Sequence, residues 1–188
     1  NETGIYLTIS SSNTLSNITA NYNNETGIYF DHSFSNTLSN ITANYNNETG
    51  IYLTISSSNT ITNSTLKENS EYDFYIHTSS DSDCDNKIEN IIGSNNLPIK
   101  YYNSSVSLSN EILSELILCN ADYSNIDNIT INGSQNLNNN ALLLVRTDHS
   151  NISNIYSSNN FIGLSISSST SNIFTSITAN FNSQDGIS

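Results

Sequence analysis

Short stretches in which apolar and polar residues alternate recur along the whole chain. In the first of them, Ile5, Leu7 and Ile9 alternate with polar or aromatic neighbours, and a second stretch begins at Leu15 and bends near Asn17. A period of two residues is typical of strands with one buried face, and no stretch shows the 3.6-residue apolar period of a helix. We therefore expect strands joined by polar corners and almost no helix.

The alternation belongs to a repeat of 23 residues. The segment NETGIYLTISSSNTLSNITANYN at 1–23 returns with few changes at 24–46 and 47–69, and weaker copies are assigned to 70–96, 97–111, 112–137, 138–159, 160–182 and a start at 183. A fixed period of this length indicates a solenoid, because one unit cannot bury its own apolar face. We predict an all-β parallel solenoid of about eight coils in one domain, 1–188, with insertions at about 78–85 and 103–114.

Equivalent residues of successive coils should lie above one another, ~4.8 Å apart. Two apolar columns are expected to fill the interior: Ile5, Ile28, Ile51, Phe74, Leu116, Leu142 and Leu164, and Leu15, Leu38, Ile61, Ile88, Ile126, Ile152 and Phe174. A column of asparagines is expected to face inward and to share amide hydrogen bonds along the axis. It comprises Asn17, Asn40, Asn63, Asn90, Asn128 and Asn154.

A further column is expected on the outer face of the first strand of each coil. It runs through Tyr6, Tyr29, Tyr52, Tyr75, Ile117 and Leu143. An aromatic ladder beside an apolar patch is unusual for a free surface, and it could stack sugars or contact another protein. Strand propensity and cross-strand pairing of tyrosines would explain it equally well.

The phrases SNTLSNITANYNNETGIYL and NALLLVRTDHSNISNIYSSNNFIGLSI resemble the right-handed parallel β-helix repeat proteins. These are common among secreted surface proteins of archaea and bacteria and are related to the carbohydrate-binding and sugar-hydrolase β-helix superfamily. The resemblance covers essentially the whole chain and implies a right-handed parallel β-helix. It implies no single activity, because several functions share this fold.

The charge balance excludes several partners. Seventeen acidic residues face four basic ones, for a formal net charge of −13. Nucleic-acid binding requires clustered Lys and Arg, and the same deficit disfavours anionic membranes. No apolar run approaches the ~18 residues of a membrane span, so we expect no nucleic-acid partner and no membrane insertion.

Enzymes of the resembled superfamily act on acidic polysaccharides, which requires a cationic group together with a base or paired carboxylates. The cations are Lys67, Lys87, Lys100 and Arg146. Arg146 lies near Asp148 and His149 in the only Arg/Asp/His cluster, and we interpret it as a buried or edge residue paired with Asp148. We therefore do not expect an enzyme.

The acidic segment SSDSDCDNK is the candidate metal site. Asp81, Asp83 and Asp85 alternate as at the start of a calcium loop, but the Gly and the Glu that complete such a loop are missing. A solvated acidic insertion is the competing interpretation. We expect no cofactor, with Ca²⁺ as the one candidate ion. Glu2, Glu25, Glu48 and Glu71 form a second acidic column, which we interpret as exposed and screened.

Cys84 and Cys119 are the only cysteines, and a disulfide between them would be reasonable in a secreted protein. Two unpaired thiols are the alternative. Ten N-x-[ST] sequons occur, and the sites expected to carry glycans are Asn1, Asn24, Asn47, Asn103, Asn132 and Asn151. The sequons of the asparagine column, Asn17, Asn40, Asn63 and Asn128, are expected to point inward and to carry none.

Together these features favour a structural protein of the cell surface, of the S-layer kind: an extracellular, N-glycosylated rod or filament. A carbohydrate-binding or adhesion module is the alternative, and a polysaccharide lyase or hydrolase fragment is the third hypothesis. The printed chain lacks an initiator Met, which suggests a trimmed secreted precursor or a segment of a longer solenoid. For head-to-tail self-association, we expect Gly186 and Ile187 to lie over residues 161–164 and to be covered by residues 4–7 of a neighbour.

Overall fold

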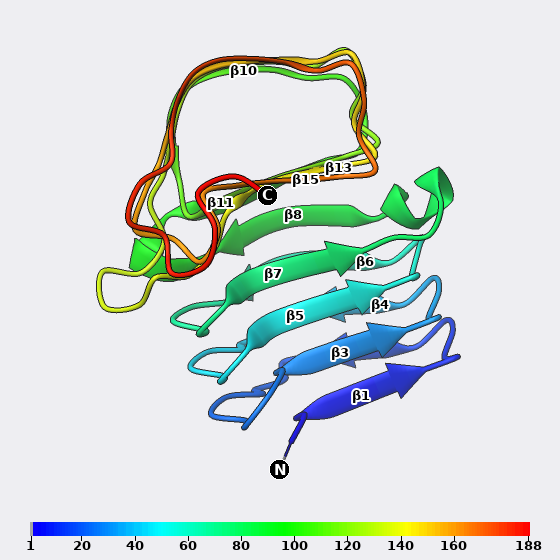
Figure 1. The fold of residues 1–188 in the computed structure, drawn as a ribbon. Helices are drawn as coiled ribbons and strands as arrows, with labels where there is room; N and C mark the ends of the chain where they lie inside the picture. Colours follow the sequence, from blue (N-terminus) through cyan, green and yellow to red (C-terminus); the bar gives the residue numbers. More distant parts are fainter. Residues whose placement is uncertain (1) are drawn as a thin grey trace.

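The computed structural model describes residues 2–188, and these residues form a parallel β-solenoid of eight coils with two strands in each coil. The coils fall into two stacks of four (Figure 1). The first stack contains β1 (Ile5–Thr8), β2 (Thr14–Ser16), β3 (Ile28–Asp31), β4 (Thr37–Ser39), β5 (Thr49–Thr54), β6 (Thr60–Thr65), β7 (Tyr72–His77) and β8 (Lys87–Ile92). The second contains β9 (Pro98–Tyr102), β10 (Ser107–Leu113), β11 (Glu115–Cys119), β12 (Asn125–Ile131), β13 (Leu142–Val145), β14 (Asn151–Ser157), β15 (Leu164–Ser167) and β16 (Ile173–Thr178).

The register of the first stack follows the repeat. Ile5 pairs with Ile28, and Ile28 pairs with Ile51, in parallel ladders. Between β7 and β8 the chain makes the excursion expected at 78–85, which contains the 3₁₀ helix η1 (Asp81–Cys84). The excursion lengthens that coil without disturbing the pairing of Ile61 with Ile88.

The prediction of an insertion at 103–114 is wrong. Residues 107–113 form β10, which pairs in parallel with β12 and opens the second stack. The chain reaches this strand after a reversal: it turns through the 3₁₀ helix η2 (Ser94–Asn96), and β9 then runs antiparallel to β8 through the pairs Ile91 with Ile99 and Ile92 with Pro98.

One eight-stranded sheet therefore continues through both stacks, in the order β15-β13-β11-β9-β8-β6-β4-β2. The other two sheets, β1-β3-β5-β7 and β10-β12-β14-β16, each belong to one stack. In Figure 1 the coils of the first stack are seen from the side, whereas those of the second nearly superimpose in projection. The two stack axes therefore point in different directions.

Alternate residues of the shared sheet serve different cores. Leu116 and Leu118 of β11 belong to the core of the second stack, whereas Ile117 and Cys119 belong to the core that begins in the first stack. Successive side chains of a strand point to opposite faces, so the second stack has its core on the opposite face of the shared sheet. The other face of the shared sheet, which carries Ile117 and Cys119, covers the end of the first stack.

This reversal breaks the two interior columns that the sequence predicted as continuous. The sequence placed Leu116 next to Phe74 in the first column. In the structure Leu116 pairs with Lys100 and Leu142 instead, so it does not stack on Phe74. In the other column, Ile88 lies in the shared sheet and Ile126 in a different one. Within each stack the columns are correct, because Phe74 and Ile126 are both fully buried in the stack to which each belongs.

Buried asparagines hold the corners of the first stack. Asn36 donates its backbone N–H and its side-chain Nδ2 to Asn59 Oδ1, at 2.9 and 3.1 Å, and Asn59 repeats this contact with Asn86. A second such column runs from Asn23 through Asn46 to Asn69. These amides satisfy backbone groups that would otherwise be buried without partners at the bends.

Candidate functional site

The outer tyrosine ladder exists, but it is confined to the first stack. Tyr6, Tyr29, Tyr52 and Tyr75 occupy one register position of β1, β3, β5 and β7, with ring centroids 5.0, 4.9 and 5.1 Å apart. Beside the first three rings lies a shallow groove of about 270 Å³, also lined by Thr3, Glu25, Thr26 and Glu48. Rings and acidic groups therefore share one face.

Ile117 and Leu143 do not extend this ladder, and their assignment to an exposed interface is wrong. Ile117 is 0% exposed and Leu143 is 1% exposed, and both pack in the core at the junction of the stacks. The physical reason is the reversal at β8 and β9. It turns this face of β11 and β13 away from solvent and over the end of the first stack.

The glutamates beside the ladder influence one another. Burial, followed by the negative charge of Glu25, raises the pKa of Glu48. Burial, followed by the charge of Glu48, raises the pKa of Glu71 in the same way. Thr3 Oγ1 donates a hydrogen bond to Glu25 Oε2 at 3.2 Å. The column is therefore less exposed than the sequence suggested, since Glu25 and Glu71 are half-buried.

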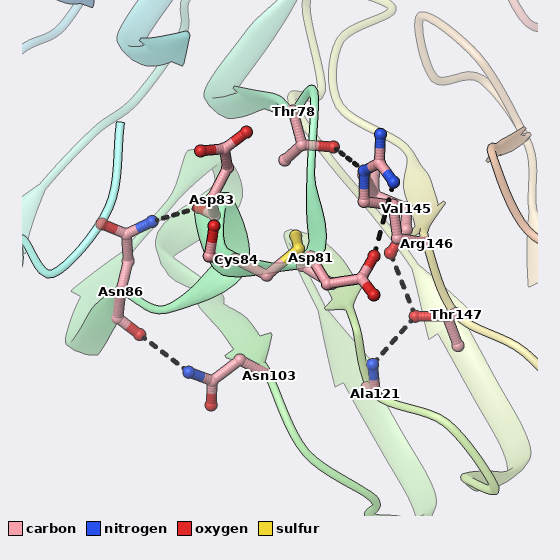
Figure 2. Close-up of a disulfide and its surroundings, with 12 residues drawn as sticks. Thr78, Asp81, Asp83, Cys84, Asn86, Asn103, Ala121, Val145, Arg146 and Thr147 are labelled. Carbon is pink, nitrogen blue, oxygen red and sulfur yellow. Dashed lines mark hydrogen bonds and ion pairs between the residues drawn. A yellow bond between two sulfur atoms is a disulfide. The ribbon is translucent and has the colours of Figure 1, made fainter. Parts of the chain in front are cut away.

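The two cysteines are joined in a disulfide that connects the stacks. Cys84 lies on the excursion of the first stack and Cys119 at the end of β11, and both are fully buried. Figure 2 shows Arg146 beside this bridge, directed toward the excursion. Its Nε donates to Thr78 Oγ1 at 3.0 Å, and its Nη1 lies 3.4 Å from Asp81 Oδ1. The expected pairing of Arg146 with Asp148 is therefore wrong.

Two of the three aspartates of the candidate calcium loop, Asp81 and Asp83, contact different partners. Asp83 Oδ2 accepts hydrogen bonds from the backbone N–H groups of Ser79 and Ser80 and from Ser79 Oγ. Burial opposes ionisation of Asp83, but these hydrogen bonds outweigh it and lower the pKa. Asp81 faces Arg146 instead.

These aspartates therefore form a capped turn rather than a converging set of ligands. Within residues 2–188, no group of three or more His, Cys, Asp or Glu side chains is placed to hold a metal ion.

A buried polar cluster closes the end of the first stack. Glu115 Oε2 accepts the backbone N–H of Phe74 at 3.0 Å, and Asn140 Oδ1 accepts that of Asp73 at 2.7 Å. The Asp73 carboxylate in turn accepts the backbone N–H of Ser94 at 2.7 Å and the Nδ2 of Asn140 at 2.9 Å. Side chains of the second stack thus replace the strand that a fifth coil of the first stack would supply to β7.

Two fully buried carboxyl groups meet in this cluster, so their charge states are coupled. Burial raises the pKa of Asp73, although hydrogen bonds from Asn140, Ser94 and Asn69 oppose the shift. Burial, followed by the charge of Asp73, raises the pKa of Glu115 well above its usual range. Since Asp73 has several donors and Glu115 has one, we assign the proton to Glu115. Glu115 Oε1 is the one buried side-chain oxygen or nitrogen of the described chain that has no partner.

The asparagine column faces solvent, contrary to expectation. Asn17, Asn40 and Asn63 are exposed and lie at bends with φ between 53° and 55°. Some of the expected amide contacts are present, since Asn40 Nδ2 donates to Asn17 Oδ1 at 3.4 Å and Asn90 Nδ2 to Asn63 Oδ1 at 3.2 Å. Asparagine tolerates this left-handed conformation better than most residues, and the bend turns its side chain outward. The remaining members, Asn90, Asn128 and Asn154, are also exposed.

The other sequons are mostly exposed. Asn24, Asn47, Asn132 and Asn151 are exposed, and Asn103 is half-buried, with its Nδ2 3.4 Å from the backbone oxygen of Asn86. Asn1 lies outside the described residues. The structure therefore leaves the sequons of the asparagine column as accessible as those that were expected to carry glycans.

The last residues of the chain begin another rung, as expected from the repeat. Ile187 forms a parallel bridge with Leu164, and Gly186 O accepts the backbone N–H of Leu164 at 3.0 Å. Ile187 is exposed on this rung.

A hollow lies along β8 and β9, beside the two pairs that join these strands. It has a volume of about 640 Å³, and its lining is mainly apolar, including Ile88, Ile92, Pro98 and Tyr102. The one cation in its lining, Lys100, is engaged, because its Nζ lies 2.5 Å from Glu111 Oε2. Sequence reasoning missed this hollow because it depends on the reversal.

Comparison with known proteins agrees with the geometry. The structure is a parallel β-solenoid, and residues 1–115 match the family described as the right handed beta helix region. The chain therefore belongs to that family. No curated protein and no solved structure matches the chain. Within residues 2–188, no helix has the length and apolarity needed to cross a membrane.

Proposed function

We propose that this chain is a structural protein of the extracellular surface, in which the two stacks form a bent, rigid and glycosylated rod. The observation that carries the proposal is the buried Cys84–Cys119 disulfide, which fixes one stack against the other. Disulfides persist in oxidising compartments, as outside the cell. Exposed sequons such as Asn24 and Asn47 on the corners of the coils support the same location.

The contacts of the four cations favour a structural role over an enzymatic one. Arg146 contacts Thr78 and Asp81, Lys100 pairs with Glu111, and Lys87 pairs with Glu89 at 3.2 Å. Lys67 Nζ lies 2.6 Å from Asn96 Oδ1. Each cation therefore has a partner within the chain. Incubation with uronic-acid polymers and Ca²⁺ checks this part of the proposal, since new unsaturated or reducing ends would contradict it.

Head-to-tail self-association is part of the proposal. Its expected contact is a coil of a neighbour that covers Ile5, Leu15 and Ile18, which this chain buries only partly. Electron microscopy of the purified protein should show filaments, and light scattering should show a mass that rises with concentration. A single monomeric species at every concentration would remove self-association from the proposal.

The surface location has its own test. Antibodies against the folded protein should label intact cells of the source organism, and alkylation of the denatured protein without reductant should leave both cysteines unmodified. Labelling only after permeabilisation, together with two alkylated cysteines, would contradict the proposed location.

A carbohydrate-binding role is the second candidate, favoured by the ladder of Tyr6, Tyr29 and Tyr52 beside its groove. Aromatic rings spaced about 5 Å apart offer apolar edges and hydroxyl groups to a chain of sugars. A glycan array probed with the parent chain and with Tyr29→Ala tests this role. Binding that is lost in the variant would support it, and an absence of binding would exclude it for the glycans on the array.

A further inference from the structure

A second aromatic column, on a corner of the first stack, ends at a pocket. Tyr22 and Tyr45 occupy equivalent positions in successive coils, with φ of 57° in both. Their rings are stacked at 5.1 Å with an interplanar angle of 6°. The hydrogen bonds between coils show which residue follows Tyr45 in this column. Tyr22 N donates to Asn44 O, the residue before Tyr45, and Tyr45 N donates to Lys67 O, the residue before Glu68. Glu68 is therefore the next residue of the column, and its backbone is also in the left-handed region. The stack of rings therefore stops at Tyr45.

The pocket lies where the stack stops. It has a volume of about 500 Å³ and is lined by Tyr45, Lys67, Glu68, Asn95, Asn96, Gln135 and Asn136. Tyr22 covers one face of the Tyr45 ring and is not part of the lining. The other face of Tyr45 is therefore available on the side of Glu68, and Tyr45 is 50% exposed. The volume falls within the roughly 300–1,000 Å³ that is usual for sites of small ligands.

Besides Tyr45, three segments far apart in the sequence build this lining, and hydrogen bonds hold these three together. Gln135 Nε2 donates to Asn95 Oδ1 at 2.9 Å, which connects the loop before β13 to the turn between β8 and β9. Ser134 Oγ donates to Glu68 Oε2 at 2.6 Å, and Lys67 Nζ donates to Asn96 Oδ1 at 2.6 Å. Glu68 N donates to Ser94 Oγ at 2.7 Å. The polar walls are thus fixed before a ligand arrives.

Groups that could serve a ligand remain after these contacts. Within the described chain, the Nδ2 atoms of Asn95 and Asn96 make no hydrogen bond, and the same is true of the Asn136 side chain and of Gln135 Oε1. Amides offer both donors and acceptors, which matches sugar hydroxyl groups. The apolar C–H face of a pyranose ring fits the open face of an aromatic ring, and it would continue the column where the next tyrosine is missing.

We propose that this pocket binds a neutral saccharide, with one sugar ring stacked on Tyr45 and its hydroxyl groups bonded to the surrounding amides. The charge of the site favours a neutral ligand over an acidic one. Lys67 is already engaged with Asn96, Glu68 is adjacent, and the chain carries a net charge of −13. The site is independent of the tyrosine ladder on β1, β3, β5 and β7, and it goes beyond the structural role proposed above.

Isothermal titration calorimetry tests this proposal with cellohexaose, mannohexaose and chitohexaose as neutral probes and hexagalacturonate as the acidic probe. At least one neutral probe should bind the parent protein. Tyr45→Ala should weaken that binding by about tenfold or more, Tyr45→Phe should retain it, and Asn136→Ala should weaken it less. Unchanged circular dichroism melting curves would show that the variants fold.

Tyr123→Ala is the matched control. Tyr123 is also an exposed corner tyrosine with φ of 58°, and it is stacked on His149 in the second stack, away from the pocket. Its truncation should leave the affinity unchanged. The proposal is overturned if no neutral probe binds, if only the acidic probe binds, or if Tyr45→Ala binds as tightly as Tyr123→Ala. Loss of binding in Tyr29→Ala, with Tyr45→Ala unaffected, would instead place the sugar on the ladder.

Discussion

Phe74 of β7 donates its backbone N–H to the side chain of Glu115, a residue of the second stack, across 3.0 Å. In a continuous solenoid this N–H would bond to the backbone of the next coil. A side chain fills that role instead, because the chain reverses at β8 and β9 and the second stack covers the end of the first. The junction therefore depends on a few specific side chains rather than on the repeat.

Glu115 should make the stability of the protein fall as the pH rises. Its pKa in the folded state is raised by burial and by Asp73, so the folded protein binds this proton more tightly than the unfolded chain does. The stabilisation is complete below the ordinary Glu pKa and is lost as the pH rises through the folded value. Urea unfolding between about pH 4 and about pH 9 should show this decline.

Glu115→Gln is the matched variant for that experiment. It keeps an oxygen that can accept the Phe74 N–H, but it cannot ionise beside Asp73. Its unfolding free energy should therefore depend less on pH than that of the parent. The variant should become more stable relative to the parent as the pH rises. Equal slopes in the two proteins would show that Glu115 does not titrate in this range.

The disulfide should stabilise the junction strongly. Cys84 and Cys119 are 35 residues apart, and closing a loop of this length in the unfolded chain is worth roughly 3–4 kcal/mol. The double variant Cys84→Ser/Cys119→Ser should lose about that amount of unfolding free energy in urea titrations. Reductant should weaken the parent and leave the double variant unchanged. A parent that is equally stable with and without reductant would mean that the bridge does not form.

The two kinds of asparagine column should respond differently to mutation. Asn59 is fully buried and exchanges hydrogen bonds with Asn36, Asn86 and Ser33 O, so Asn59→Ala should lower the unfolding free energy by about 2–3 kcal/mol. Asn63 is exposed at a left-handed bend, so Asn63→Gly should change it by less than about 0.5 kcal/mol. Similar losses in the two variants, measured by thermal and urea unfolding, would mean that the columns are assigned to the wrong faces.

The same exposure changes the glycan pattern that we expect. Asn17 and Asn63 point to solvent, and their Nδ2 atoms donate no hydrogen bond within residues 2–188, whereas Asn40 Nδ2 donates to Asn17. Glycans should therefore occur on Asn17 and Asn63 as well as on Asn24 and Asn47. Intact-glycopeptide mass spectrometry of protein from its source measures the occupancy. Glycans on Asn24 and Asn47 with none on Asn17 and Asn63 would argue that the bends are less accessible than the structure shows.

The repeat was sufficient to predict the solenoid, the number of coils and the registers within the first stack. Ile28, Ile51 and Phe74 stack as expected because each coil presents the same residue at the same position. The reversal was not predictable in this way. It arises in residues 93–98, at the boundary between the copies assigned to 70–96 and 97–111, and its stabilising contacts join positions as distant as Asp73 and Asn140. The outward bend at Asn63 was missed because a left-handed residue inside a strand disturbs the strict alternation of faces.

The most direct test of the two-stack arrangement is the unfolding free energy of Leu143→Asp. In a continuous solenoid Leu143 would lie on the outer face, where a carboxylate is tolerated. In the structure Leu143 is buried at the junction, so an aspartate there should lower the unfolding free energy by several kcal/mol, on the order of 3 or more. Ser165→Asp, at the paired position on β15, is the control and should lower it by no more than about 1 kcal/mol. A Leu143→Asp protein as stable as Ser165→Asp in urea would contradict the account.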